Sequence, residues 1–510
     1  MGAFQSKVVK EIQEALNHDV SLYAFPFGLG YQSEHVRRYN LDITTTPIAV
    51  TYPKTTAQVA AIVKIAANAG LKVQAKSGGH SYAKYSSPDG GIIVDLKHFQ
   101  KFEMDPKTWW ATVGAGTLLG DLTKRVHDPR HRAMAHGTCP QVGIGGHATI
   151  GGLGPSSRLF GAALDHIEEV EVVLADGSIK RASTAENADL FWALKGAAAS
   201  FGIITDFVVH TELTPDEAVQ YGFSFTAGTW GDMAQAFKAW QKFVLDKSLD
   251  WKFASTATIT EAGLAISGTY FGTKAEFDEF AKGPGFPISS QAEGTIVFRE
   301  WLGLVEHWAE DIALHFGGGI PAHSYTKTLT FNGDQPTPDA VIDKIFEYIK
   351  TTKKDVWFAI FDLASGKVNE VPMDATAYAH RDALFYLQSY AISDKLGQNV
   401  SNTTTDFPRG LNQLIKSEMA KANENTDFGA YAGYVDPELP DGQKEYWRSN
   451  LDRLEIIKAK YDPKDVFHNW QSVRPNGEDV LTPAVLQQPS DLSGWIGKAF
   501  RALKVGGAHG

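Results

Sequence analysis

Two segments in the first half of the chain are unusually rich in glycine. They are residues 76–82 (KSGGHSY) and residues 137–148 (GTCPQVGIGGHA). Glycine leaves backbone N–H groups uncovered, and several such groups in succession form a concavity that binds anions such as a pyrophosphate. Either segment alone could instead be a tight turn that requires positive φ. Two of them in one unit favour a nucleotide-like cofactor.

The second segment contains a partial match to a dinucleotide-binding fingerprint. Gly143, Gly145 and Ala148 fit the pattern G-x-G-x-x-A, and Asp165 lies 20 residues after Gly145. That fingerprint must follow an apolar strand and open a helix. Here residues 137–140 (GTCP) precede it, and residues 151–155 (GGLGP) would interrupt any helix after it. The context therefore excludes a Rossmann-type nicotinamide site and leaves the identity of the nucleotide open.

The residues around these segments predict one α+β unit over residues 43–214. Thr56 is expected to cap a helix over residues 57–69 that ends at Gly70, and residues 175–178 (ADGS) are expected to form a hairpin turn. Residues 1–17 are expected to form an amphipathic helix. Strands are expected at residues 48–50, 71–75, 92–96, 110–113, 167–174 and 203–209.

From about residue 215 the pattern changes to longer strands separated by helices. Strands are expected at residues 221–226, 251–259, 264–270, 325–331 and 356–363, and helices at residues 230–247 and 338–351. This predicts a second domain built on one sheet with helices. A helix over residues 446–460 is expected to pack back on the first unit. We therefore predict an α+β chain of two domains, with segments 1–214, 215–435 and 436–510, the last returning to the first domain.

Composition limits the partners. The 48 basic and 59 acidic residues among 510 give a net charge of −11, which disfavours nucleic acid. The same charge favours a neutral or cationic small molecule as partner. No run approaches the roughly 18 apolar residues of a membrane span, so no membrane span is expected. Residues 1–17 lack the apolar stretch of a signal peptide, so a cytoplasmic protein is expected. The alternative is secretion after loss of a leader, for which the sequons at Asn399 and Asn402 would be available.

The only cysteine of the chain, Cys139, lies in the second glycine-rich segment, so no intramolecular disulfide can form. A free cysteine is most often a buried apolar residue, but a thiol beside a cofactor can serve as a nucleophile or a covalent tether. His80 lies on the other glycine-rich segment, where it is either a satisfied polar residue or a ligand. No second ligand follows at zinc spacing, and Pro129 breaks the helix that would align His127 with His131. No metal site is predicted.

Several motifs resemble those of the berberine-bridge-enzyme-like branch of the vanillyl-alcohol-oxidase flavoprotein superfamily. The first unit most resembles the fungal glucooligosaccharide oxidases. The resemblance covers residues 43–214 almost continuously and resumes at residues 461–472. Its motifs are residues 77–82 (SGGHSY), 137–140 (GTCP), 142–147 (VGIGGH), 187–196 (NADLFWALKG) and 200–205 (SFGIIT).

The resemblance implies FAD held by two covalent bonds, from the flavin 8α-methyl group to His80 and from flavin C6 to Cys139. It also implies that Gly143, Gly145 and Gly146 lie under the pyrophosphate and that the backbone from Gly202 to Ile204 meets the adenine end. The remaining cofactor-binding residues that it implies are Gly78, Gly79, Ser81, Thr138, Val142, His147, Asn469 and Gln471. A small branched residue at Val142 is the choice of an oxidase, which supports O2 as acceptor.

For catalysis, the resemblance places a tyrosine base at Tyr434, within residues 431–436 (YAGYVD), where Gly433 replaces the asparagine of the family pattern. A free tyrosine has a pKa of about 10 and needs a neighbour that accepts its proton. By register that neighbour is Asp362, although a strand-end aspartate in a turn is an equal alternative. Tyr82 and Gln388 match substrate-side positions, or are polar residues at the edge of a core.

One substrate position departs from the family pattern. Ile360 stands where the glucooligosaccharide oxidases carry a substrate-binding glutamine, and residues 253–257 lack their Arg and Glu contacts. Apolar groups at these positions should weaken the binding of sugars, because each buried hydroxyl must keep its hydrogen-bond partners.

The expected activity is that of an FAD-linked oxidase. It transfers hydride from a carbinol or anomeric C–H to the flavin, turning an oligosaccharide reducing end into a lactone, and O2 becomes H2O2. The alternative, suggested by Ile360 and by the absence of a leader, is an intracellular tailoring oxidase that oxidises a natural-product alcohol or drives oxidative cyclisation. A flavin-binding protein without turnover is a third hypothesis.

Overall fold

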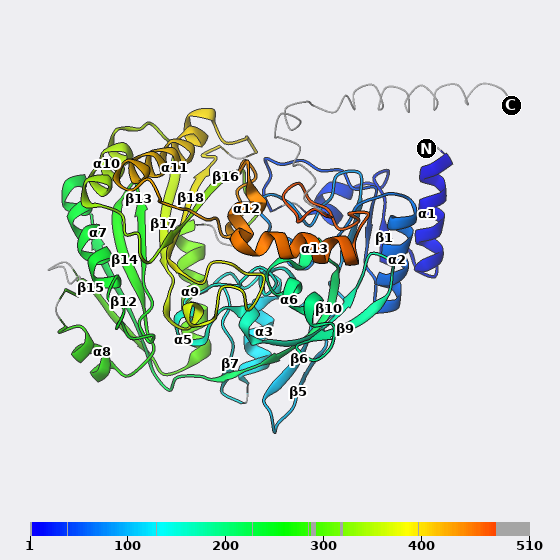
Figure 1. Ribbon diagram of the computed structural model, residues 1–510, viewed down its shortest axis with the longest axis horizontal. Coiled ribbons are helices and arrows are strands. Elements are labelled where there is room, and N and C mark those ends of the chain that lie inside the picture. Colours follow the sequence, from blue (N-terminus) through cyan, green and yellow to red (C-terminus); the bar gives the residue numbers. More distant parts are fainter. Residues whose placement is uncertain are drawn as a thin grey trace.

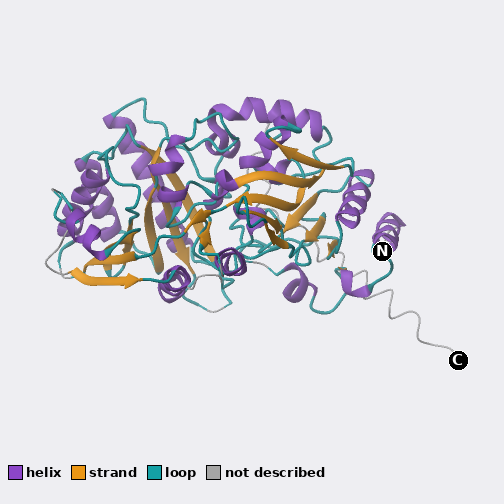
Figure 2. Ribbon diagram, turned by 90° about the horizontal axis from the view of Figure 1, so that it is seen from below, coloured by secondary structure: helices purple, strands orange, loops and turns teal. Residues whose placement is uncertain are grey.

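The computed structural model describes residues 3–475, except residues 38, 129, 227, 284, 287–291, 317–319 and 396. Its fold is α+β, and its strands form separate sheets in the two halves of the molecule (Figures 1 and 2). The tail returns to the first half: Leu454 and Ile457 are buried in the same core as Val59 and Leu190. In Figure 1 this tail is the orange helix α13.

The first half contains a four-stranded sheet in the order β1-β2-β4-β3 and a five-stranded antiparallel sheet in the order β5-β6-β10-β8-β9. The strands of these sheets are β1 (Tyr23–Ala24), β2 (Ala49–Thr51), β3 (Val73–Lys76), β4 (Ile92–Asp95), β5 (Phe102–Met104), β6 (Trp110–Gly114), β8 (Ile167–Val173), β9 (Ile179–Ser183) and β10 (Ile203–His210). A short pair is formed by β7 (Arg132–Ala133) and β11 (Glu212–Leu213). The helices are α1 (Ala3–Ala15), α2 (Thr56–Asn68), α3 (Leu119–His127), α4 (Ile144–His147), α5 (Ser157–Phe160) and α6 (Ala188–Ala197).

The second half is built on a seven-stranded antiparallel sheet in the order β15-β12-β14-β13-β17-β18-β16. Its strands are β12 (Ala218–Phe225), β13 (Thr256–Thr260), β14 (Gly263–Tyr270), β15 (Ala292–Phe298), β16 (Ser324–Asn332), β17 (Val356–Leu363) and β18 (Ala383–Ile392). The helices are α7 (Trp230–Val244), α8 (Lys274–Phe280), α9 (Trp301–Phe316), α10 (Asp339–Thr351) and α11 (Asn402–Ala422), followed in the tail by α12 (Gly442–Trp447) and α13 (Leu451–Tyr461).

Helices α7, α10 and α11 cover one face of the large sheet (Figure 1). Phe237 of α7 packs against Phe361 of β17, with ring centroids 4.8 Å apart. Because side chains alternate along a strand, Ile360 and Asp362 point to the other face. Both residues line a cavity there. The sheet therefore has a core side and a cavity side.

Several predicted elements differ in detail from the structure. The cap of α2 is Thr55 rather than Thr56, because the Thr55 hydroxyl accepts the N–H of Gln58 at 3.2 Å. The strand expected over residues 251–259 begins only at residue 256. The tail helix expected over residues 446–460 is divided into α12 and α13, because Arg448 adopts a φ of +46° and turns the chain between them.

Candidate active site

The two glycine-rich segments contact each other directly through their backbones. A Cβ atom on Gly78 would lie 2.5 Å from the Gly143 nitrogen, and one on Gly143 would lie 2.3 Å from the Gly78 nitrogen. Only glycine permits this approach. Gly146 differs, because a Cβ atom there would meet nothing within 4 Å, and this residue faces the cavity. The two segments thus form one continuous wall with an uncovered backbone.

This wall is one side of a cavity of about 1710 Å³, whose other side is the large sheet of the second half. The cavity brings together the residues predicted from sequence for the cofactor and the substrate, with the exception of Gln471. They are Gly78, Gly79, His80, Ser81, Tyr82, Thr138, Cys139, Val142, Gly143, Gly145, Gly146, His147, Gly202, Ile204, Ile360, Asp362, Gln388, Tyr434 and Asn469.

Gln471 does not line the cavity and is only 2% exposed. Its side-chain amide donates hydrogen bonds to the carbonyls of Asp436 (2.9 Å) and Leu439 (3.1 Å), and its oxygen accepts from the Tyr446 hydroxyl at 3.0 Å. Gln471 therefore fixes the segment that follows Tyr434 rather than reaching the cavity itself.

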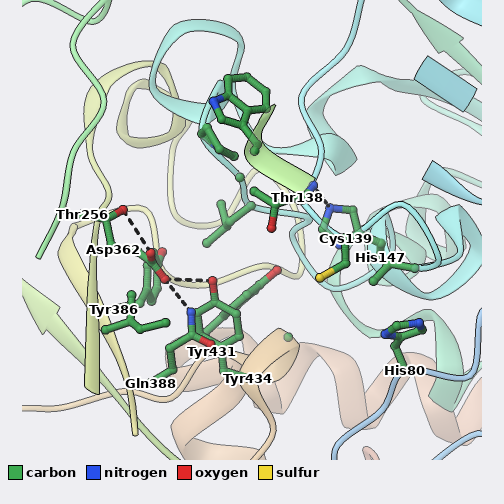
Figure 3. A pocket seen from close by; sticks show the side chains of 18 of the residues that line it. His80, Thr138, Cys139, His147, Thr256, Asp362, Tyr386, Gln388, Tyr431 and Tyr434 are labelled. Carbon is green, nitrogen blue, oxygen red and sulfur yellow. Dashed lines mark hydrogen bonds between the residues drawn. The ribbon is translucent and has the colours of Figure 1, made fainter. Parts of the chain in front are cut away.

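His80 and Cys139 both line the cavity, on neighbouring segments of the wall (Figure 3). Burial lowers the pKa of His80 to about 4, so its imidazole is neutral at pH 7. Burial raises the pKa of the Cys139 thiol. The ring of Tyr39 packs against His80 with centroids 4.6 Å apart, and Asn40 donates a hydrogen bond to the Tyr82 carbonyl at 2.8 Å. Residues 39 and 40 thus hold the His80 segment in place.

The turn that carries Cys139 is fixed by a half-buried histidine, His147. The Gly137 N–H donates to Nε2 of His147 at 2.9 Å, and burial lowers the pKa of His147 to about 3. The neutral ring therefore carries its proton on Nδ1 and accepts at Nε2. The Nδ1 of the preceding residue, His136, lies 2.8 Å from the Gly137 carbonyl, so the N–H and the carbonyl of Gly137 both have a histidine partner.

Asp362 and Tyr434 meet on the sheet side of the cavity (Figure 3). Tyr434, in the short 3-10 helix Ala432–Tyr434, donates its hydroxyl proton to Oδ2 of Asp362 at 3.0 Å. Gln388 of β18 donates to the same oxygen at 2.8 Å, and Thr256 of β13 donates to Oδ1 at 3.4 Å. Asp362 is the second-last residue of β17, as expected of a strand end, and its carboxylate is bound on both oxygens.

The electrostatics of this pair suit it for proton transfer. Burial raises the pKa of Asp362, against the opposing effect of its three hydrogen bonds. Burial and the Asp362 charge raise the pKa of Tyr434 well above its usual value. In the resting pair the proton therefore lies on Tyr434. If Tyr434 accepts a proton from a substrate, its own proton can pass to Asp362, whose raised pKa makes it a better acceptor than an exposed carboxylate.

The structure adds residues that sequence reasoning missed. Tyr431 lines the cavity, and its hydroxyl accepts the N–H of Gly152 at 2.9 Å. A Cβ atom at Gly433 would lie 2.3 Å from the Tyr431 ring, so glycine at this position makes room for that ring. Thr256 could have been found from the alternation of Thr256, Thr258 and Thr260 along their strand, which places all three on one face.

Among the described residues, no group of three or more His, Cys, Asp and Glu side chains is arranged to hold a metal ion. None of the helices in the described part of the chain is long and apolar enough to cross a membrane.

Two family models match the chain: the FAD binding domain over residues 47–183, and berberine and berberine like over residues 430–474. The FAD-linked oxidoreductase sorD of Penicillium rubens is 38% identical over 461 residues, which cover 89% of this chain and 96% of the relative. The glucooligosaccharide oxidase of Sarocladium strictum is 31% identical over 457 residues, which cover 86% of this chain and 89% of the relative.

A solved structure of a glucooligosaccharide oxidase from Acremonium strictum, described as having a 6-S-cysteinyl, 8α-N1-histidyl FAD, has a TM-score of 0.82 to this chain. It is 29% identical and covers 91% of this chain and 99% of its own.

The wall also fits FAD on its own geometry. It offers an uncovered backbone at Gly146, a neutral imidazole and a thiol in one cavity. The resemblance noted in the motifs is thus confirmed over most of the chain by whole-length relatives. This chain belongs to the berberine-bridge-enzyme-like family of FAD-linked oxidoreductases, with the fold of the vanillyl-alcohol-oxidase superfamily.

Proposed function

We propose that this protein is an oxidase that binds FAD covalently through His80 and Cys139 and oxidises the CH–OH group of a small molecule. The observation that carries this proposal is the position of the hydrogen-bonded Tyr434–Asp362 pair in the same cavity as His80 and Cys139. The bicovalent attachment draws support from the related Acremonium strictum oxidase, whose FAD is described as both cysteinyl and histidyl.

When bound, FAD accepts hydride from the carbinol carbon and passes the electrons to O2, which becomes H2O2. The chain supplies the proton chemistry. Tyr434 accepts the hydroxyl proton of the substrate while its own proton moves to Asp362. Gln388 and Thr256 hold the carboxylate so that one oxygen stays aimed at Tyr434. Val142, beside Cys139 in the wall, is the small residue expected of an oxidase on the O2 side.

The relatives suggest one class of substrate. Glucooligosaccharide oxidase, xylooligosaccharide oxidase and chitooligosaccharide oxidase are 31–32% identical to this chain. On that basis the first candidate substrate is the reducing end of an oligosaccharide, whose product would be a lactone that hydrolyses to an aldonic acid.

A second candidate, an alcohol of natural-product biosynthesis, is favoured by one feature of the site. Ile360 lines the cavity two residues before Asp362 on β17, on the same face of the strand. Its side chain offers no hydrogen bond to a sugar hydroxyl.

The experiment that tests the proposal is a peroxide assay on the FAD-loaded protein with cello-, malto-, xylo- and chito-oligosaccharides and several hydrophobic alcohols. We expect peroxide with at least one substrate and its loss in Tyr434→Phe, with FAD content unchanged. Flavin should remain with the acid-precipitated wild-type protein and should be released from the His80→Ala/Cys139→Ala double variant. Yellow colour that stays with the denatured double variant would contradict the attachment.

A further inference from the structure

The cavity side of the large sheet is divided into a polar and an apolar area. The polar area consists of Thr256, Thr258, Asp362 and Gln388, which lie on β13, β17 and β18. The apolar area, which we call the aromatic subsite, consists of Phe358, Ile360, Tyr390 and Tyr82. Three of its members are on β17 and β18, and Tyr82 follows His80 on the glycine-rich wall.

The aromatic subsite is a packed cluster of its own. The rings of Phe358 and Tyr390 stack with centroids 4.5 Å apart, and the ring of Tyr82 meets Tyr390 edge-on at 5.4 Å. Phe358, Ile360 and Tyr390 are all less than 10% exposed, and what remains exposed faces the cavity. Phe358 and Ile360 present only carbon to the cavity.

The strand register fixes where this subsite lies relative to the proton-transfer pair. Asp362, Ile360 and Phe358 are successive cavity-facing residues of β17, so neighbours are about 6.6 Å apart at about 3.3 Å per residue. That is about the width of one six-membered ring. A substrate whose hydroxyl contacts Tyr434 and whose skeleton extends along β17 would place its next ring against Ile360, Phe358 and Tyr390.

We propose that the aromatic subsite binds an aryl or other apolar ring next to the carbinol carbon, so that the substrate class is ring-bearing apolar alcohols rather than oligosaccharides. This inference rests on the proposed oxidase function. A sugar ring in the same place would present hydroxyls to Ile360 and to two aromatic side chains, and each buried hydroxyl without a partner weakens binding. A flat apolar ring loses no hydrogen bonds there and gains aromatic contacts.

The test compares cellobiose with 2-naphthalenemethanol and cyclohexylmethanol on FAD-loaded protein, following anaerobic bleaching of the flavin absorbance. The wild-type protein should be bleached by the ring-bearing alcohols with an apparent second-order rate constant at least about tenfold above that for cellobiose, in line with pocket-level discrimination. Ile360→Gln should lower the rate constant for the naphthyl alcohol about tenfold or more, because its buried amide is left without a hydrogen-bond partner. The ratio of the rate constants for the naphthyl alcohol and cellobiose should fall as well. Ile360→Val, the matched control, keeps an apolar side chain at this position and should retain the preference for the ring-bearing alcohols over cellobiose.

The FAD content and melting temperature of each variant show whether it folds. Phe358→Leu serves as a second variant if Ile360→Gln does not fold. Faster bleaching by cellobiose than by the ring-bearing alcohols would overturn the assignment of the aromatic subsite. So would an unchanged preference for the naphthyl alcohol over cellobiose in a folded Ile360→Gln or Phe358→Leu protein. A flavin that no alcohol bleaches, although dithionite reduces it, would instead contradict the proposed function.

Discussion

Replacing Asp362 with asparagine removes the acceptor of the Tyr434 proton with almost no change in shape. The amide oxygen of the new side chain can still accept from Tyr434 and Gln388, which now bond to Oδ2 of Asp362 at 3.0 and 2.8 Å. Its NH2 group would face the Thr256 hydroxyl, which can accept a hydrogen bond. The Asp362→Asn variant should therefore fold and bind FAD while losing only the charge and the basic oxygen.

The size of the effect follows from two contributions. A hydrogen bond to a charged acceptor is worth about 1.5–3 kcal/mol and a neutral one about 0.5–1.5 kcal/mol, so weakening the Tyr434 contact alone costs about tenfold. Losing a positioned acid–base group costs about 10²–10⁴ in rate. At 1.36 kcal/mol per factor of ten, this is about 2.7–5.4 kcal/mol of transition-state stabilisation. We expect kcat/KM of Asp362→Asn to fall by about 10²–10⁴.

The pH dependence gives an independent check. Because burial raises the pKa of Asp362, the wild-type kcat/KM should fall at low pH with an apparent pKa above the usual 3.8, as the acceptor becomes protonated. Asp362→Asn should lack this acid limb. The pKa of Tyr434 lies well above 10, so Tyr434 should cause no alkaline loss at ordinary pH.

Stability should change in the opposite direction from activity. The folded state binds the Asp362 proton more tightly than the unfolded chain does, so the contribution of this group to stability is lost as pH rises from 3.8 through the raised pKa. The neutral amide avoids this cost, and Asp362→Asn should melt no lower than wild type at pH 7. Stopped-flow flavin bleaching and thermal melting measure both quantities. A kcat/KM within threefold of wild type would refute the reasoning, as would an acid limb retained in the variant.

Two further predictions concern the cofactor wall. In a Cys139→Ala background, Tyr39→Ala should lower the fraction of flavin that stays attached to the acid-precipitated protein, because the ring packed 4.6 Å from His80 is lost. Tyr39→Phe keeps the ring and should preserve this fraction. Equal fractions in the two variants would contradict the view that Tyr39 positions His80. Gly143→Ala should lower the melting temperature of the apoprotein, because its Cβ would lie 2.3 Å from a backbone nitrogen. Gly146→Ala should leave that temperature unchanged and weaken FAD binding. Melting curves and a titration of the apoprotein with FAD measure both effects, and a Gly146→Ala protein with wild-type affinity would contradict the role of the wall in binding FAD.

The elements that the sequence predicted well are those with strong local signals. Val59, Ile62, Val63 and Ala66 form one buried face of α2, and the strands around the glycine-rich segments lie within a few residues of their predicted bounds. The strand β18 was missed because nearly all of its residues are buried, so it has no alternation of polar and apolar residues to distinguish it. Its position between β17 and β16 is what brings Gln388 beside Asp362.

The site depended on contacts that no local pattern encodes. Tyr434 and Asp362 are 72 residues apart, and their pairing came from a family resemblance before the structure placed them at 3.0 Å. Tyr39 belongs to no motif. It is held beside His80 by the pairing of residues 39–41 with Ala322 of the second half. The burial of Gln471 away from the cavity likewise follows from its hydrogen bonds to residues 436 and 439, which spacing alone does not reveal.

The most direct test of the proposed chemistry is anaerobic mixing of the FAD-loaded protein with an alcohol substrate carrying either hydrogen or deuterium at the carbinol carbon. We predict that the flavin absorbance is bleached, that bleaching is slower with deuterium, and that Tyr434→Phe slows it further without loss of FAD. A flavin that dithionite reduces but that no alcohol bleaches, or an equal rate for both isotopes and for the Tyr434→Phe variant, would contradict hydride transfer assisted by Tyr434.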